Sequence, residues 1–412
     1  MDKQLAVFGQ HDQKTLGQLL DVAARAEKAA LMADGHLGYV MPIGGVAAYR
    51  DQVSVVGVGF DIACGNAAIR TDLKRSDLGK DEYAIEKRLN RIADEIADTI
   101  SFGIGRKNRA DDAPVDHPLF DSPAWDAVPS AHRAGLKDKA RAQLGTVGSG
   151  NHYVDVFADE DDTIWVGVHF GSRGFGHTVA SGFLALGQGR SWGERVPEKE
   201  VLLSLSTPLG QAYWSLMELA GRYAYAGREW VARKVVDIIG AREAELVHNH
   251  HNFAWRENHD GEEVIVVRKG ATPAFPGQKS FIGGSMGDDA VIVQGTPREH
   301  ATPEIREAQR QALYSTVHGA GRIMSRTAAA GRRKWRGRKH REEGAINRAM
   351  MLDWVRKKGV ILRGGGTDES PHVYRRLPEV LAAQGPTIEV LHTLRPLIVV
   401  MAGADEFDPY KD

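Results

Sequence analysis

Helical and β-type patterns follow one another along this chain in an irregular order, and this order restricts the fold more than any other feature of the sequence. Apolar residues at helical spacing predict helices over 13–33, 82–100, 226–247 and 303–316. Short β-rich runs predict strands at 53–60, 163–169, 263–268, 290–294, 359–362 and 396–401. A doubly wound sheet requires strict alternation of strand and helix. The pattern therefore favours the α+β class, with mixed sheets and flanking helices.

The length of 412 residues corresponds to roughly two to three average domains, but no clear linker divides the chain. We therefore expect one continuous domain over 1–412. Residues 103–136 are rich in Pro, Asp, Arg and Gly, which predicts a long surface loop of the kind that often acts as a lid or binding segment. Residues 404–412 are expected to form a C-terminal tail.

Charge and composition exclude several classes of protein. The chain has 53 Lys and Arg against 54 Asp and Glu, so its net charge of −1 argues against a globally basic nucleic-acid coat protein. Its 1 cysteine excludes an intrachain disulfide. No apolar run reaches the roughly eighteen residues of a transmembrane helix, and residues 1–17 lack the apolar core of a signal peptide. We expect a cytoplasmic protein without membrane association.

The single cysteine lies in the segment GVGFDIACGNAAIRTDL, where Asp61 precedes Cys64 by three residues. A lone cysteine is most often a small buried hydrophobe. Glycines flank this pair, however, and the 46 glycines of the chain suggest tight turns and backbone that packs closely against ligands. A glycine-rich turn after a β-run would present Asp61 and Cys64 together from one exposed turn.

Three further segments place histidines at the end of a β-run or in a glycine-rich turn. They are LGTVGSGNHYVDV with Asn151 and His152, VGVHFGSRGFGH with His169, and HNHHNFAWRE with His248, His250, His251 and Asn252. Each histidine alone could be an ordinary core or surface residue. Together with Asp61 and Cys64 they supply a carboxylate, a thiolate and several imidazoles, which indicates a transition-metal site. By ligand softness, zinc or iron would be the expected metal.

Another histidine lies in STVHGAGRIMSR. Small residues beside His318 would let a phosphate approach its imidazole and the neighbouring N–H groups, and Arg322 could bind the phosphate oxygens. The alternative is a helix that ends at glycine with a capping histidine.

These segments resemble the RtcB family of RNA ligases over nearly the whole chain. The resemblance begins at DGHLGYVMPIGG (34–45) and continues to Gly403. The matching blocks, in family order, are GVGFDIACG, GTVGSGNH, HFGSRGFGH, HHNFAWRE, VRKGATPAFPG, GGSMG, HGAGR and TDESPHVYR.

The resemblance implies a single α+β domain of the family's own type and an RNA-joining activity. Members of the family join an RNA end with a 2′,3′-cyclic phosphate or 3′-phosphate to a 5′-hydroxyl, using GTP and two Mn²⁺ ions. Manganese thereby replaces zinc or iron as the expected metal, with zinc as an inhibitory occupant. The implied role is tRNA splicing or RNA repair. Whether an activating protein partner is needed stays open.

The resemblance also implies a role for each matching residue. Cys64 would bridge the two metals, Asp61 and His152 would complete one site, and His169 and His251 the other. His318 would be the nucleophile that becomes guanylylated. The matching nucleotide positions are Asn151, Asp155, Ser285 and Ala320, and those that hold phosphates are Asn151, Arg173 and Arg322.

Three positions associated with guanine recognition in the family differ in this chain. Asp155 stands in place of a Glu, and Ala290 in place of a Ser. The terminal Val-Lys-Gly of the family corresponds to VVMAG, after which the chain continues through ADEFDPYKD. These changes predict a weakened preference for GTP over ATP. Alternatively, backbone groups or Lys411 replace the lost contacts and GTP remains preferred.

The segment RRKWRGRKHR at 332–341 is the expected RNA contact, because Trp335 lies among cationic residues that suit phosphates and base stacking. The alternative is a solvated helix face, since Glu342 and Glu343 follow. Two rival functions also remain. One is a metal-dependent phosphoesterase that opens cyclic phosphates, and the other is a non-catalytic metal- or RNA-binding paralogue. The intact set of metal and nucleophile residues argues against the second.

Overall fold

The structure, a computed structural model, describes residues 4–331 and 343–403. Its strands are β1 (Gln4–Val7), β2 (Lys28–His36), β3 (Ile43–Tyr49), β4 (Gln52–Ser54), β5 (Gly65–Lys74), β6 (Tyr153–Ala158), β7 (Thr163–Phe170), β8 (Leu202–Ser204), β9 (Glu243–His250), β10 (Asn252–His259), β11 (Glu262–Lys269), β12 (Ala271–Pro273), β13 (Lys279–Ile282), β14 (Ala290–Gly295), β15 (Ser315–Val317), β16 (Ile361–Arg363) and β17 (Ile388–Met401). Its α-helices are α1 (Gln13–Ala23), α2 (Val55–Val58), α3 (Glu82–Thr99), α4 (Ser130–Gln143), α5 (Arg173–Gly187), α6 (Pro208–Ile239), α7 (Pro303–Gln311), α8 (Arg326–Ala330), α9 (Arg348–Lys357) and α10 (Leu377–Gln384). Short 3₁₀ helices are η1 (Arg75–Leu78), η2 (Pro118–Asp121), η3 (Pro123–Ala127), η4 (Thr367–Glu369) and η5 (Pro371–Val373).

Two large sheets form the centre of the molecule. The larger has the strand order β13-β14-β17-β6-β7-β5-β9, with β16 beside β17. The smaller has the order β1-β2-β3-β11-β10, and β12 with β15 and β4 with β8 form two-stranded sheets. Among the described strands only β1–β2 and β16–β17 pair in parallel. The mostly antiparallel pairing confirms the predicted α+β class with mixed sheets and flanking helices.

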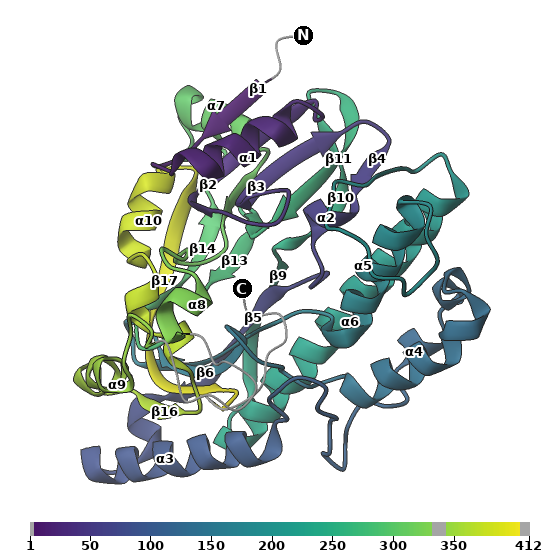
Figure 1. Cartoon of the computed structure of the whole chain (residues 1–412). Helices are drawn as coiled ribbons and strands as arrows, with labels where there is room; N and C mark the ends of the chain where they lie inside the picture. The colour runs from purple at the N-terminus through teal and green to yellow at the C-terminus, as the bar shows by residue number, and fades with distance from the viewer. Residues whose placement is uncertain (1–3, 332–342, 404–412) are drawn as a thin grey trace.

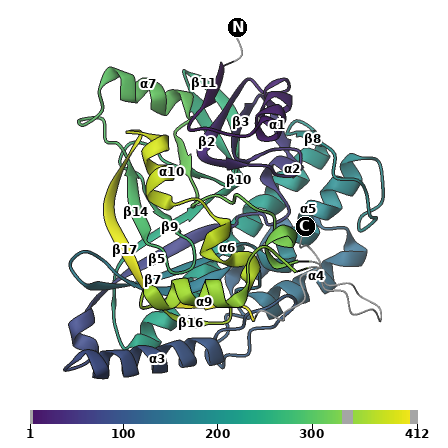
Figure 2. The same ribbon diagram turned by 60° about the vertical axis from the view of Figure 1, so that its left-hand side comes forward.

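Helices cover the larger sheet along two sides. In Figure 1 and Figure 2, α3 runs along one edge of the molecule below β16, and it contacts β16 and β17. The long helix α6 packs across β5 and β7, with α5 beside it. Apolar side chains pack α5 against α6, where Phe175 of α5 contacts Tyr223 of α6. Val231 and Val235 of α6 belong to one apolar cluster with Ile69 of β5 and Val168 of β7, so α6 covers this face of the sheet.

Three of the four predicted helices end earlier than the sequence indicated. The expected helix 13–33 ends at Ala23, and β2 begins at Lys28. The helix that was expected over 226–247 is the last part of α6, which ends where Gly240 takes a left-handed conformation (φ 79°) before β9. Helix α7 likewise ends before β15. In each case a buried strand continues the apolar run, and such a strand cannot be distinguished from helix by apolar content alone. Only 82–100 is confirmed, as α3.

The strand predictions are largely confirmed, with one error. The runs 163–169, 263–268, 290–294 and 396–401 lie within β7, β11, β14 and β17, and part of 359–362 forms β16. The expected strand 53–60 is wrong, because β4 ends at Ser54. The hydroxyl of Ser54 accepts a hydrogen bond from the N–H of Gly57 and caps the short helix α2.

The predicted loop 103–136 is irregular only in its first half. Its second half holds η2, η3 and the start of α4. The side chains of Phe120 and Trp125 are buried there, and the indole N–H of Trp125 donates to the carbonyl of Leu119. These aromatic contacts give regular structure to a segment whose polar composition predicted a loop.

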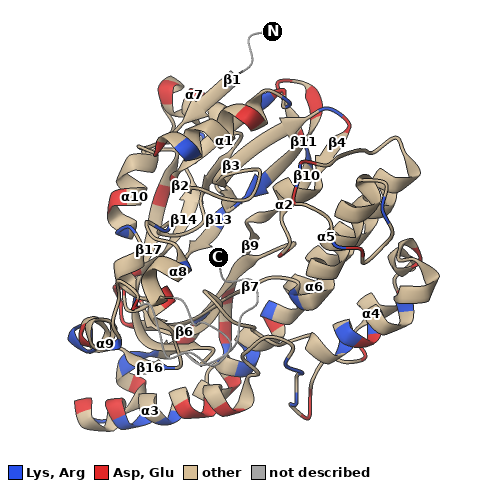
Figure 3. Cartoon of the chain, in the orientation of Figure 1, with Lys and Arg blue, Asp and Glu red and all other residues tan. Residues whose placement is uncertain are grey.

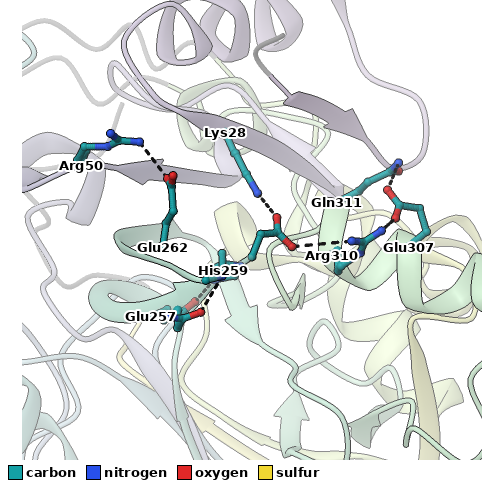
Figure 4. A network of polar contacts seen from close by, with 11 residues as sticks. Lys28, Arg50, Glu257, His259, Glu262, Glu307, Arg310 and Gln311 are labelled. Atoms are coloured by element: carbon teal, nitrogen blue, oxygen red, sulfur yellow. Dashed lines mark hydrogen bonds and ion pairs between the residues drawn. The ribbon is translucent and has the colours of Figure 1, made fainter. Parts of the chain in front are cut away.

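The outer surface carries charges of both signs. Along α3, Lys and Arg alternate with Asp and Glu (Figure 3). At the opposite end, ion pairs join the β10–β11 hairpin to β2 and α7, where Lys28 and Arg310 both contact Asp260 (Figure 4). Among the helices that the structure describes, none combines the length and the apolar character that a membrane span requires.

Candidate active site

A cleft of about 860 Å³ collects nearly all of the side chains that the sequence singled out. The predicted site residues that line it are Asp61, Cys64, Asn151, His152, Asp155, His169, His251, Ser285, His318, Ala320 and Arg322. Arg173 is not among the lining residues and lies behind His152. The volume is in the range of pockets that bind cofactors and small molecules.

Adjacent strand ends bring the ligand-type residues together. Cys64 immediately precedes β5, which lies between β7 and β9 in the sheet. His169 belongs to the end of β7, and His251 directly follows β9. Gly65 is required at this crossing, because a Cβ there would lie 2.2 Å from the carbonyl oxygen of Asn249. The expected exposed turn is found only in part, because Cys64 is buried between these strands, whereas the side chain of Asp61 is 31% exposed.

The first group of donors, the Asp–Cys–His cluster, consists of Asp61, Cys64 and His152. The Nε2 atom of His152 lies 3.2 Å from Oδ2 of Asp61 and 3.7 Å from the Sγ atom of Cys64. Its Nδ1 atom lies 2.9 Å from the carbonyl oxygen of Val147, which can only accept. The same Nδ1 atom lies 3.1 Å from Nη1 of Arg173, which can only donate, so these contacts do not fix which ring nitrogen carries the proton. They do fix the ring, with Nε2 facing the other two donors.

The second group, the Cys–His–His cluster, consists of Cys64, His169 and His251. The Nε2 atom of His169 lies 3.7 Å from the Sγ atom of Cys64. Its Nδ1 atom lies 2.6 Å from Oδ1 of Asn66, whose amide donates to the carbonyl of Phe281, so this histidine turns a lone pair toward the thiol. The Nδ1 atom of His251 is buried and has no hydrogen-bond partner among the described residues.

The chemistry of both clusters fits bound cations. Within each cluster the ligand atoms lie within 4.8 Å of one another, and Cys64 belongs to both. Burial and the charge of Asp61 raise the pKa of the Cys64 thiol, so a nearby cation is needed to make it a thiolate. Burial lowers the pKa of His169 and of His251, which keeps both imidazoles neutral. Burial acts to raise the pKa of Asp61, but His152 outweighs it and lowers the value to about 2.

A row of imidazole rings leads from these clusters to His318. The ring centres are 5.4 Å apart between His152 and His169, 5.2 Å between His169 and His251, and 5.0 Å between His251 and His318. His318 follows β15 and not a helix, so the prediction of a helix-capping histidine is wrong. Its side chain therefore borders the Cys–His–His cluster directly.

The carboxylate of Asp34 orients the imidazole of His318. Its fully buried Oδ2 atom accepts hydrogen bonds from the N–H groups of His318 and Gly319, and lies 2.6 Å from the Nδ1 atom of His318 in an ion-pair contact. Burial acts to raise the pKa of Asp34, but His318 outweighs this effect and holds the pKa below its usual value. The contact directs Nδ1 toward the carboxylate, which leaves Nε2 as the free nitrogen of the ring.

The residues that the family pattern assigns to the nucleotide fall into two groups. Asn151, Asp155, Ser285 and Ala320 line the cleft. The Oδ1 atom of Asp155 is buried without a hydrogen-bond partner among the described residues, and burial raises its pKa well above the usual value. Ala290, which was expected near the base, begins β14 and packs against Phe281 in the core; it is not among the cleft residues. Lys411 lies outside the described residues.

The two predicted phosphate-binding arginines differ in their surroundings. The guanidinium of Arg322 donates to Glu369 (3.1 Å), to the hydroxyl of Tyr374 (2.9 Å) and to the carbonyl of Asp368 (2.8 Å), so it is held at the cleft wall by acceptors of the chain. An Nη1 atom of Arg173 lies 3.1 Å from Nδ1 of His152. Burial lowers the pKa of Arg173.

Sequence reasoning missed the residues that support this site. Asp34 stands in the DGHLG block, which carried the family resemblance without a role for its carboxylate. Asn66 and Arg228 gave no signal, because one lies within a strand pattern and the other within a helical one. Lys269 donates to the carbonyls of Tyr39 and Val56, and burial lowers its pKa to about 8.

Comparison with known proteins identifies relatives over nearly the whole length of the chain. A family model described as tRNA-splicing ligase RtcB matches residues 18–402. The chain is 30% identical to the tRNA-splicing ligase RtcB of Thermococcus kodakarensis, with 89% of this chain and 86% of the relative aligned. It is 29% identical to the RNA-splicing ligase RtcB of Escherichia coli, with 90% and 89% aligned. It is also 30% identical to RNA-splicing ligase RtcB homolog 1 of Entamoeba dispar, with 90% and 78% aligned.

Proposed function

This chain belongs to the RtcB family of RNA ligases, and from that premise we propose that it joins RNA ends through a nucleotidylated His318, using GTP and two Mn²⁺ ions. Its substrates would be an RNA end with a 2′,3′-cyclic phosphate or 3′-phosphate and a second end with a 5′-hydroxyl. The observation that carries this proposal is the row of imidazoles that joins the two donor clusters to His318 within one cleft.

His318 is suited to act as the nucleophile. A neutral imidazole is a usable nucleophile near pH 7, because its ordinary pKa lies close to that pH. The carboxylate of Asp34 beside Nδ1 would stabilise the positive charge that develops on the ring when Nε2 attacks. A new bond from Nε2 to the α-phosphorus of GTP would form as the bond to pyrophosphate breaks, giving a phosphoramidate.

The two donor clusters would hold the metals. Cys64 would bridge two ions, with Asp61 and His152 on one and His169 and His251 on the other. Bound Mn²⁺ would neutralise phosphate charge and favour in-line geometry. By softness alone this donor set also suits zinc or iron, so manganese is the family-based choice.

The later steps would use the same cleft. The nucleotidyl group would pass from His318 to the RNA 3′-phosphate, and the 5′-hydroxyl would then attack that phosphate and release GMP. A cyclic end would first be opened by water to a 3′-phosphate. Asn151 lines the cleft and would offer its amide N–H groups to phosphate oxygens. Arg322 also lines the cleft and would have to exchange contacts with Glu369 or Tyr374 for phosphate, and Arg173 lies behind His152. We place this activity in the cytoplasm, in tRNA splicing or RNA repair.

A second candidate function is a phosphoesterase that opens cyclic phosphates without joining ends. It is favoured by the departures near the nucleotide, where Asp155 is one methylene shorter than the family residue. Such an enzyme would need the metals but no covalent nucleotide.

Labelling with nucleotide separates the two functions. The protein is incubated with Mn²⁺ and GTP labelled at the α-phosphate, and we expect an acid-labile label on the chain that pyrophosphate removes. A chain that opens a cyclic phosphate without ever taking up label would instead be the phosphoesterase.

A further inference from the structure

A fully buried arginine on helix α6 binds the strand ends that carry the candidate metal ligands. The guanidinium of Arg228 lies behind β5, β7 and β9, and its side chain has no exposed surface. Its Nη1 atom donates to the carbonyl oxygens of Ala63 (2.9 Å) and Phe170 (2.6 Å). The Nη2 atom lies 2.8 Å from the Nδ1 atom of His250.

Each of these three partners is a sequence neighbour of a cluster residue. Ala63 directly precedes Cys64, Phe170 directly follows His169, and His250 directly precedes His251. A single rigid, planar group therefore holds the main-chain carbonyls next to Cys64 and His169 and the imidazole next to His251. Because the guanidinium presents its donors in a fixed fork, it sets the separation of the three strand ends as well as joining them.

His248 and His250 were possible metal ligands on the sequence alone. In the structure their rings accept hydrogen bonds from Arg228 instead. The Nε2 atom of His248 accepts from Nε of Arg228 at 2.9 Å. A guanidinium has no acceptor atom, so the facing nitrogens of both histidines must carry lone pairs. Tyr225 stacks on His250 with ring centres 3.9 Å apart and also contacts His248, which fixes both rings.

The contacts of Arg228 differ from those of the other large buried arginine. Arg268 is also fully buried, but it pairs with the carboxylate of Glu257 at 2.6 Å. The hydrogen-bond partners given above for Arg228 are all neutral. Burying a cation without a carboxylate partner is costly, so a packing role alone is a weak explanation for an arginine at this position.

We propose that Arg228 is a positioning residue of the candidate metal centre, which fixes the separation of Cys64, His169 and His251 through the carbonyls of Ala63 and Phe170 and the ring of His250. This inference rests on the metal centre of the proposed function. It adds a residue that touches neither metal nor substrate and that acts by geometry.

Cobalt binding by the full-length, metal-stripped protein tests the role without requiring ligation. Co²⁺ bound to a thiolate gives a charge-transfer band, and equilibrium dialysis gives the affinity. Arg228→Met is expected to lower Co²⁺ affinity about 10- to 100-fold, the usual loss when a residue that orients metal ligands is removed, and to shift the band. A folded Arg228→Met protein with wild-type affinity and an unchanged band would overturn the proposal.

A matched pair at His248 covers the case in which Arg228→Met does not fold. His248→Gln keeps an acceptor near the place of Nε2, whereas His248→Leu removes it. We expect His248→Leu to lose affinity and His248→Gln to stay within about threefold of wild type, well below the loss expected for removal. Equal affinities for the two variants would refute the role of Arg228. A wild-type protein that gives no thiolate–cobalt band would refute the metal centre itself, and with it this inference.

Discussion

His318 is the residue whose removal separates the proposed chemistry from the fold. Its side chain is 17% exposed at the cleft wall, so His318→Ala leaves no large cavity. We expect this variant to lose covalent nucleotide label completely but to remain folded. Its melting temperature should decrease, because the buried carboxylate of Asp34 loses Nδ1 of His318 and keeps only the N–H groups of residues 318 and 319. His300→Ala is the matched control, since that histidine is 59% exposed and pairs only with Glu389 among the described contacts. Substantial label on His318→Ala would refute its assignment as the nucleophile.

Cys64 is the one residue shared by both donor clusters. A small-residue change in a packed core costs roughly 1–3 kcal/mol of stability, whereas loss of a bridging thiolate would impair both metal sites. We therefore expect Cys64→Ser to lose most of its bound metal, measured by elemental analysis, while the metal-free protein melts within a few degrees of wild type. Unchanged metal content with unchanged activity would return Cys64 to the role of a core hydrophobe.

Asp155 governs the prediction for the nucleotide base. Burial raises the pKa of Asp155 and so favours its neutral form. A neutral carboxylic acid can both donate and accept, and this suits adenine as well as guanine. We expect the ratio of GTP to ATP labelling on His318 to stay below about a hundredfold, or roughly 2.8 kcal/mol. Asp155→Asn, also neutral, should keep this ratio. Ala290→Ser is the control behind the cleft and should not change it. A larger GTP preference in wild type would contradict the prediction.

The residues of the candidate site could be found from the sequence because they stand in short glycine-rich blocks with chemically distinctive side chains. Asp34 and Arg228 could not. Their partners are 284 residues away for Asp34 and His318, and 165 for Arg228 and Ala63. Only tertiary packing brings such pairs together, and the sequence around either residue does not predict the contact.

At the scale of elements, the sequence predicted the type of a segment better than its ends. Helix α3 was predicted correctly because polar and apolar residues alternate at helical spacing along its whole length. The end of α1 at Ala23 was missed because the apolar residues of β2 begin only a few positions later. The 3₁₀ helices after Pro118 and Pro123 depend on caps by His117 and Ser122, which are too local for periodicity to detect.

His248, in strand β9, is expected to make the free energy of unfolding depend on pH. Burial and then the charge of Arg228 lower the pKa of this histidine from 6.5 to about 3. Between these values the unfolded chain binds a proton that the folded protein excludes. The free energy of unfolding therefore falls as pH decreases, by up to about 1.4 kcal/mol per pH unit from this group.

Melting of metal-free protein at about pH 7.5 and pH 5.5, on either side of the ordinary histidine pKa, measures this effect. His248→Gln, which cannot titrate, should show a smaller decrease in melting temperature than wild type. Carboxylates affect both proteins alike, so equal decreases would show that His248 does not control acid sensitivity.

At the scale of the whole molecule, a chain with a net charge of −1 must hold RNA by local positive charge. Arg322 and Arg326 line the cleft, but their positive charge is already paired, because both contact the carboxylate of Glu369 (3.1 and 2.9 Å). The basic segment 332–341 lies outside the described residues. The last helix that the structure describes before this segment is α8, and its first residue, Arg326, lines the cleft.

Charge reversal in that segment tests whether it binds RNA. Changing Arg333, Arg336 and Arg338 to Glu should weaken RNA binding and flatten its salt dependence by about two units of slope, because three phosphate contacts at roughly 0.7 each are lost. Self-nucleotidylation should persist, since His318 and the clusters are untouched. The matched control reverses three exposed charges, Lys80 just before α3 and Lys87 and Arg91 within it. Equal weakening by both triple variants would point to bulk charge alone. Parallel loss of label would show that the segment serves the cleft and not RNA docking.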